Sequence, residues 1–109
     1  MSQHIIHHQY QGETIIITLG WDRPLQGFFM VICALKRSGQ GYLYSNLDDP
    51  NLISCNGLPS SLDYFLKKLA ALDLTIPPSM IESVQLDGIL NMGNRVVYYP
   101  TDGHEHLPS

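Results

Sequence analysis

The chain has 109 residues, a length that predicts one domain with room for a single hydrophobic core. Charged residues make up 15 % of it, against roughly 25 % in a typical soluble domain, and the formal net charge is −4. The apolar fraction of 44 % and the presence of only 2 cysteines argue against intrinsic disorder, collagen-like repeats and a disulfide-dense scaffold. We therefore expect one folded soluble domain over residues 1–109.

The first half of the chain is rich in β-branched and aromatic residues, in runs that end at glycine or proline. This pattern is typical of strands joined by turns. The breaks at 11–12, 20–24 and 38–41 predict reversals, so consecutive strands should pair as an antiparallel meander. The four predicted strands are His4–Tyr10, Glu13–Leu19, Gly27–Leu35 and Gly41–Ser45.

Two of these strands are apolar at consecutive positions, Ile15–Ile17 and Phe28–Leu35. Successive residues of a strand point to opposite faces of the sheet, so both faces at its centre carry apolar side chains. A one-sided antiparallel sheet would instead alternate apolar and polar residues. The pattern indicates that something besides the chain's own helices shields the second face.

A segment rich in turn-forming residues at 46–57 separates the sheet from two helices. The first helix is predicted to begin near Ser61, and its apolar residues repeat at helical spacing. These residues are Leu62, Phe65, Leu66, Leu69 and Leu72. Pro77 and Pro78 end this helix, and Ser79–Glu82 forms a capping-box pattern that opens a second helix, which closes near Asp87 and Gly88.

A turn at 91–94 leads to a last strand, Arg95–Tyr99. The element order is then four strands, two helices and one strand. It predicts an α+β fold, an antiparallel sheet of about five strands in β-β-β-β-α-α-β order with two helices packed on one face. The polar residues 101–109 are expected to form a flexible tail.

Charge and hydropathy limit the partners and the location. No basic and apolar leader is visible, which favours the cytoplasm, and the longest apolar run, Phe28–Leu35, is too short to cross a membrane. Cys33 lies in that run and Cys55 in a polar loop, so we expect two free thiols. The negative net charge argues against nucleic-acid binding. No cofactor motif is present, and we predict no cofactor.

Five histidines lie at the two ends of the chain and could supply ligands for zinc, copper or nickel. Their spacing matches no established metal pattern, so we predict no metal site. If the termini did share one, its ligands would come from His4, His8, His104 and His106.

The turn-rich segment holds the polar residues from which a small-ligand or catalytic site could be built. Asp48, Asp49 and Cys55, with His7, are the residues considered for such a site. The spacing from Asn46 does not match a calcium loop, because the twelfth position is Gly57. The alternative reading is that these residues serve the turns alone.

Aromatic residues suggest a protein interface. Trp21 and Arg23 are predicted at the tip of a turn, and tryptophan, tyrosine and arginine are enriched at interface hot spots. Tyr42, Tyr44 and Tyr99 follow on the sheet. The alternative is that Trp21 folds over the sheet edge and the tyrosines pack against the core.

Two functional hypotheses follow. The first is a non-enzymatic interaction or regulatory module that acts as a homodimer or binds another protein, based on the sparse surface charge and the two-sided apolar strands. The second is a small-ligand or catalytic domain that uses the 46–57 segment. No nucleophile or phosphate-binding motif supports an enzyme, and we favour the first hypothesis.

Overall fold

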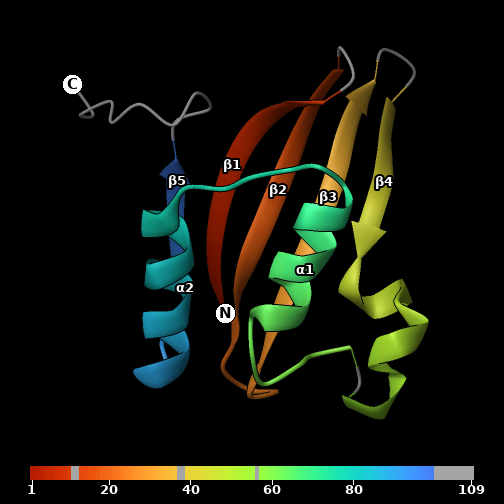
Figure 1. Cartoon of the computed structure of the whole chain (residues 1–109). Helices are drawn as coiled ribbons and strands as arrows, with labels where there is room; N and C mark the ends of the chain where they lie inside the picture. The colour runs from red at the N-terminus through yellow and green to blue at the C-terminus, as the bar shows by residue number, and fades with distance from the viewer. Residues whose placement is uncertain (11–12, 37–38, 56, 100–109) are drawn as a thin grey trace, which may run out of the picture.

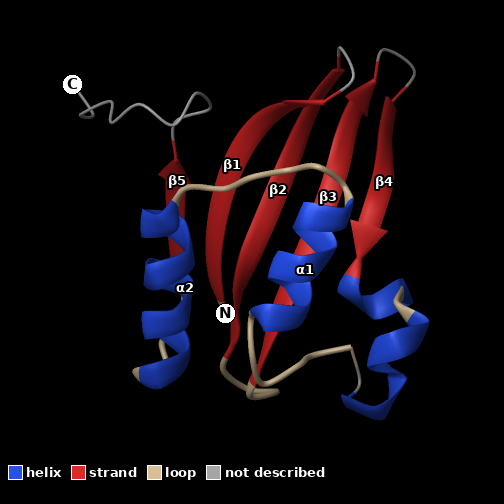
Figure 2. Ribbon diagram, viewed as in Figure 1, coloured by secondary structure: helices blue, strands red, loops and turns tan. Residues whose placement is uncertain are grey.

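The computed structural model describes residues 1–10, 13–36, 39–55 and 57–99. These residues form an α+β fold in which a five-stranded sheet carries helices on one side (Figures 1 and 2). The strands are β1 (Ser2–Tyr10), β2 (Glu13–Asp22), β3 (Gly27–Lys36), β4 (Gly39–Ser45) and β5 (Arg95–Tyr99). Between β4 and β5 lie the short 3₁₀ helices η1 (Asn46–Asp48) and η2 (Pro50–Cys55) and the helices α1 (Asp63–Ala71) and α2 (Pro78–Ile89).

The predicted meander of β1 to β4 is confirmed, but the expectation of an entirely antiparallel sheet is wrong at β5. The order across the sheet is β4-β3-β2-β1-β5, and β5 runs parallel to β1, with Ser2 opposite Arg95. The reason is the connection. The short turn at 90–94 sends the chain back along α2, which lies over the β1 edge, so β5 fills that edge in the direction of β1 (Figure 1). The sheet is therefore mixed.

Both helices lie on the same face of the sheet, as predicted (Figure 2). Among the strand residues whose burial the structure describes, most of those of β1, β2 and β3 that point toward the helices are buried, because side chains alternate along a strand, while those of β5 are half-buried. The buried apolar residues of the sheet are Ile6, Ile15, Ile17, Leu19, Trp21, Phe28, Met30, Ile32 and Ala34. The helices and the segments around them contribute Leu52, Leu62, Phe65, Leu69, Leu74, Met80 and Val84. One core therefore lies between the sheet and the helices.

The second strand is longer than predicted, and this changes the position of Trp21. The sequence placed a turn at 20–24, but β2 continues to Asp22 because Trp21 pairs with Phe28 and Asp22 with Gly27. The turn occupies 23–26 instead, where Gln26 has a φ of 56° and the Asp22 carboxylate accepts a hydrogen bond from the Leu25 N–H at 3.1 Å. Trp21 is therefore a core residue.

The second helix opens differently from the prediction. The Ser79–Glu82 pattern predicts a capping box, but Pro77 is the N-cap and makes no side-chain hydrogen bond, and Pro78 is the first helical residue. Proline suits this position because its φ is already helical and it has no N–H to leave unpaired. At the other end the Met92 N–H donates to the Asp87 carbonyl at 2.8 Å, and Asn91 has a φ of 51°. Within the described residues, neither α1 nor α2 is long and apolar enough to cross a membrane.

Candidate interaction surface

The sheet face opposite α1 and α2 is a surface that the described helices leave uncovered. Its side chains are the strand residues that alternate with the core, and no helix of the described ranges lies over them (Figure 2). We call it the open sheet face and define it by Gln3, Ile5, His7, Gln9, Thr14, Ile16, Thr18, Phe29, Val31, Cys33, Val96 and Tyr98. The consecutive apolar residues of Ile15–Ile17 and Phe28–Leu35 predicted that this face of the sheet would also carry apolar side chains.

The centre of the open sheet face is apolar and half-buried, its margins carry the neutral polar residues Gln3, Gln9 and Thr14, and no Asp, Glu, Lys or Arg is among the residues that define it. At its β5 edge Val96 is 53 % and Tyr98 72 % exposed. At its centre Thr18 lies between Ile5 and Val31 in register across three strands. Large exposed apolar patches on soluble domains commonly mark contact surfaces.

One glycine allows this face to be filled by an aromatic ring. A Cβ built on Gly20 would lie 2.6 Å from the Phe29 ring and 2.0 Å from the Ser2 carbonyl oxygen. The Phe29 ring and the Ser2 carbonyl of β1 therefore both approach the bare backbone of Gly20. No larger residue fits at this position.

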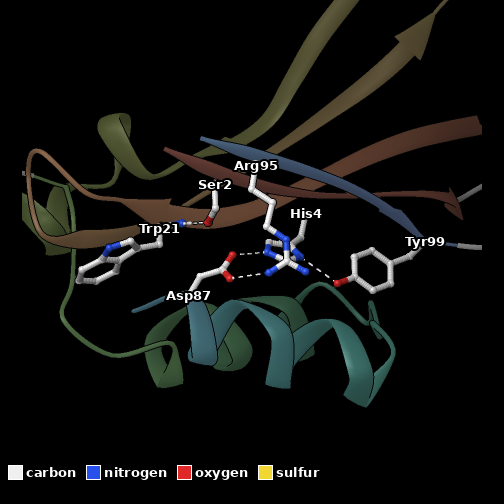
Figure 3. A network of polar contacts seen from close by, with 6 residues as sticks. All are labelled: Ser2, His4, Trp21, Asp87, Arg95 and Tyr99. Atoms are coloured by element: carbon white, nitrogen blue, oxygen red, sulfur yellow. Dashed lines mark hydrogen bonds and ion pairs between the residues drawn. The ribbon is translucent and has the colours of Figure 1, made fainter. Parts of the chain in front are cut away.

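A buried polar network ties β1, α2 and β5 together on the helix side of the sheet (Figure 3). The side chains of His4 and Asp87 are fully buried, and His4 Nε2 lies 2.5 Å from Asp87 Oδ2. Arg95 Nη1 donates to Asp87 Oδ1 at 3.0 Å, and His4 Nδ1 lies 2.8 Å from the Tyr99 hydroxyl. Because a carboxylate only accepts hydrogen bonds, Nε2 carries the proton in its bond to Asp87. Both ring nitrogens of His4 are thus engaged, and neither is free to act as a base on a substrate.

The network fixes the positions of Tyr99, which the sequence suggested as an interface residue, and of His4, which it suggested as a possible metal ligand. Burial raises the pKa of the Tyr99 hydroxyl, and its ring packs 5.8 Å from that of His4. His4 is a core residue, and its ring nitrogens face Asp87 and Tyr99. No group of three metal-ligating side chains exists among the residues that the structure describes. His104 and His106 lie outside those residues, so a site shared between the termini stays a hypothesis.

The turn-rich segment is held to α1 by a second cluster, centred on Asp49. This carboxylate accepts hydrogen bonds from the Tyr44 and Tyr64 hydroxyls, both at 2.7 Å, and from the Asn51 N–H at 3.0 Å. Lys68 Nζ lies 4.0 Å from the same carboxylate and over both tyrosine rings, at 5.5 and 5.7 Å from their centroids. Asp49 therefore fastens η2 to α1.

The pKa shifts in this cluster follow from its contacts. Burial alone would raise the pKa of Asp49, but the hydrogen bonds from Tyr44, Tyr64 and Asn51, with the charge of Lys68, outweigh burial and lower it below its ordinary value of 3.8. Burial raises the pKa of the Tyr44 hydroxyl, and the bond to Asp49 raises it further. The predicted ligand role of Asp48 and Cys55, and the interface role of Tyr42, concern side chains outside the described part of the molecule.

We expect the Asp49 cluster to make stability depend on pH. The folded chain lowers the pKa of Asp49, so its contribution to the free energy of unfolding is complete above the ordinary pKa and is lost as the pH falls through the folded one. Asp49→Asn should cost about 2 kcal/mol at pH 7. It should also flatten the acid dependence measured by urea unfolding at pH 7 and pH 3. Asp73→Asn, at an exposed residue, is the control; equal pH dependence in wild type and Asp49→Asn would contradict the prediction.

A groove on the helix side is the second surface feature. It has a volume of about 380 Å³ and lies between the C-terminal half of α2 and the segment that precedes α1. We call it the Trp21 groove and define it by Trp21, Phe28, Ser60, Ser61, Leu62, Gln85, Gly88 and Ile89. Trp21 packs edge-on against Phe28, with 4.9 Å between ring centroids, and its Nε1 donates to Asn91 Oδ1 at 3.1 Å.

The two turn residues singled out from sequence thus separate in the structure. Arg23 is exposed in the turn, whereas only the edge of the buried Trp21 ring reaches the surface, in the groove. Sequence reasoning missed the rest of this surface, which includes the exposed apolar residues Leu86, Ile89 and Leu90 of α2. Their helical spacing was the available signal, but the same spacing would equally predict a core face. Comparisons of the chain with protein-family models, with curated proteins and with solved structures found no match.

Proposed function

We propose that the protein is a non-enzymatic interaction module that works as a homodimer, with two copies joined through their open sheet faces. The observation that supports this is the position of both helices on one side of the sheet, which leaves an apolar face uncovered by any described residue (Figure 2). Sheets readily pack face to face, with their strands aligned to within about 30°. Such a dimer would have four layers, with the helices outside and two sheets in the middle.

A second copy suits this face for two reasons. The face carries no formal charge among its defining residues, so two copies meet without repulsion even though the chain has a net charge of −4. Its size is the second reason. Four strands about 4.8 Å apart and roughly six residues long, at about 3.3 Å per residue, span a plane of roughly 400 Å². Two such faces, with the relief of their side chains, approach the total of about 1,000 Å² that a specific interface needs.

The chain's own C-terminal residues are a poor alternative cover. Residues 100–109 have the sequence PTDGHEHLPS, in which Leu107 is the one aliphatic side chain apart from the prolines. One leucine cannot replace the water over a face whose apolar residues come from four strands, β1, β2, β3 and β5. A second copy brings an apolar surface of equal size.

The test is a single charge at the centre of the face. Thr18→Glu places a carboxylate between Ile5 and Val31, where it meets water in the monomer but would be buried without a counter-ion in the dimer. We expect the wild-type mass from light scattering to be about twice the 12.2 kDa of the chain. The Thr18→Glu dissociation constant, measured by sedimentation equilibrium, should rise by at least about 100-fold, which corresponds to roughly 3 kcal/mol.

Two control variants make the result specific. Thr18→Gln has nearly the same shape without the charge and should remain a dimer. Leu47→Glu adds a carboxylate at a residue that is 76 % exposed and lies off the face, and it too should remain dimeric. A wild-type chain that stays monomeric at micromolar concentrations, or a dimer that Thr18→Glu leaves intact, would overturn the proposal. We also propose that the protein acts in the cytoplasm, as its sequence predicts.

A further inference from the structure

The Trp21 groove and the surface of α2 beside it form a second apolar region, on the opposite side of the sheet from the proposed dimer interface. Along α2, Leu86, Ile89 and Leu90 are 48, 79 and 59 % exposed. They lie at i, i+3 and i+4 and therefore share one stripe of the helix, which we call the α2 stripe. Ile89 belongs to both the stripe and the groove. From this juxtaposition we propose that the groove binds an amphipathic helix of a partner protein, apolar on one side and flanked by basic residues.

The groove is built from parts that the fold holds firmly. The segment before α1 is fastened to the sheet, because the Phe28 N–H donates to the Pro59 carbonyl at 2.9 Å. A Cβ on Gly27 would lie 2.5 Å from the Leu58 side chain, so this segment and β3 are in closest contact. On the other wall a Cβ on Gly88 would lie 2.6 Å from the Phe28 ring. Both walls are therefore packed directly against the strands that carry the floor, and the groove is present in the unliganded structure.

The backbone around the groove selects a helix over an extended peptide. The floor residues Trp21 and Phe28 belong to β2 and β3, which are inner strands, and the free edges of the sheet are β4 and β5. An extended segment in the groove would find no strand edge to pair with, and its own N–H and C=O groups would lose water without gaining partners. A helix satisfies its backbone internally and needs only side-chain contacts.

Charge and chemistry define the two sides of the expected partner helix. The groove lining has an apolar floor and the neutral polar groups of Ser60, Ser61 and Gln85, which suits apolar side chains with a polar margin. Exposed acidic residues stand beside it: Glu82 lies one turn before Leu86 on α2, and Asp63 follows Leu62 at the start of α1. Lysine or arginine residues flanking an apolar stripe would complement them.

The sole tryptophan of the chain provides a direct probe, because Trp21 lines this groove and faces away from the open sheet face. The probe ligand is a 14-residue acetylated and amidated peptide of leucine and lysine, with leucine at helical spacing. Its control is a peptide of the same composition with leucine and lysine alternating, which forms a strand. We expect saturable shifts of Trp21 emission with the helical peptide, at a dissociation constant at least ten times lower than for the alternating one.

Variants of the exposed stripe locate the site. Ile89→Glu should weaken binding of the helical peptide at least tenfold, and Leu86→Glu should weaken it similarly, while Leu47→Glu, which adds the same charge elsewhere, should change it less than twofold. Because Leu47, Leu86 and Ile89 are exposed, we expect all three variants to fold. Thermal midpoints equal to that of the wild type would show this. Equal binding of both peptides, or of the helical peptide to wild type and Ile89→Glu, would overturn the inference. The titration can be run on Thr18→Glu chains, so its outcome does not depend on the proposed dimer.

Discussion

Asp87→Ala should lower the free energy of unfolding by about 3 to 5 kcal/mol, the cost of removing one partner from a buried charged network. The substitution leaves His4 Nε2 without its acceptor in a fully buried site, and it removes the carboxylate that Arg95 binds (Figure 3). Because the network joins β1, α2 and β5, protection of the β5 amides from hydrogen exchange should fall before that of β2 and β3. Urea unfolding and hydrogen exchange measure the two effects.

The control for Asp87→Ala is Asp63→Ala, at an exposed carboxylate in the first turn of α1, which should cost less than about 1 kcal/mol. Asp87→Asn keeps an acceptor of the same shape and should fall between wild type and Asp87→Ala. A cost of about 1 kcal/mol or less for Asp87→Ala, with β5 still protected, would contradict the assigned role of the network.

Gly20→Ala should lower the free energy of unfolding by about 3 kcal/mol, more than a methyl group added at any other glycine of the sheet. Its Cβ would lie 2.0 Å from the Ser2 carbonyl oxygen, a backbone atom of β1 that cannot turn aside, and 2.6 Å from the Phe29 ring. Relief requires β1 to move away, which also strains the hydrogen bond from the Trp21 N–H to Ser2 Oγ at 3.1 Å. The fall in the urea midpoint measures this cost.

Gly93→Ala is the matched control for Gly20→Ala, because a Cβ there would meet only the Arg23 side chain, at an ordinary 3.5 Å. It should change the free energy of unfolding by less than about 1 kcal/mol, since surface substitutions away from special contacts have small effects. If both alanine variants unfolded at the same urea concentration, the close approach of β1 to Gly20 would not be the constraint inferred from the structure.

The strands and helices were predictable to within a few residues because each carries its own periodicity. Ile15–Ile17 and Phe28–Leu35 identified β2 and β3 and also indicated the open sheet face, since consecutive apolar residues in a strand must occupy both sides. The leucine spacing predicted α1, whose buried residues include Phe65 and Leu69. The ends of the strands could not be predicted as closely. β2 continues to Asp22 because β3 pairs with it there, and this pairing leaves no pattern in the neighbouring sequence.

The two polar clusters were beyond the reach of the sequence. His4 and Asp87 are 83 residues apart, and nothing near either one indicates the other. His4 suggested a metal ligand and Asp87 a helix end, yet together they join β5 to the rest of the fold. In the same way, Asp49 suggested a ligand loop until Tyr64 and Lys68, on α1, were seen to occupy its oxygens. Long-range partners decide whether a polar residue is free for chemistry.

What the sequence determined by itself was the α+β class, the antiparallel meander, the two helices and the existence of a second apolar sheet face, because these depend on patterns within a few neighbouring residues. Only the tertiary structure decided that β5 pairs in parallel with β1, that Trp21 lies in the core, and that Leu86, Ile89 and Leu90 stay outside it. Those outcomes depend on which surfaces meet when the chain closes. An apolar stripe has the same spacing whether it faces the core or a partner, so the pattern alone cannot distinguish them.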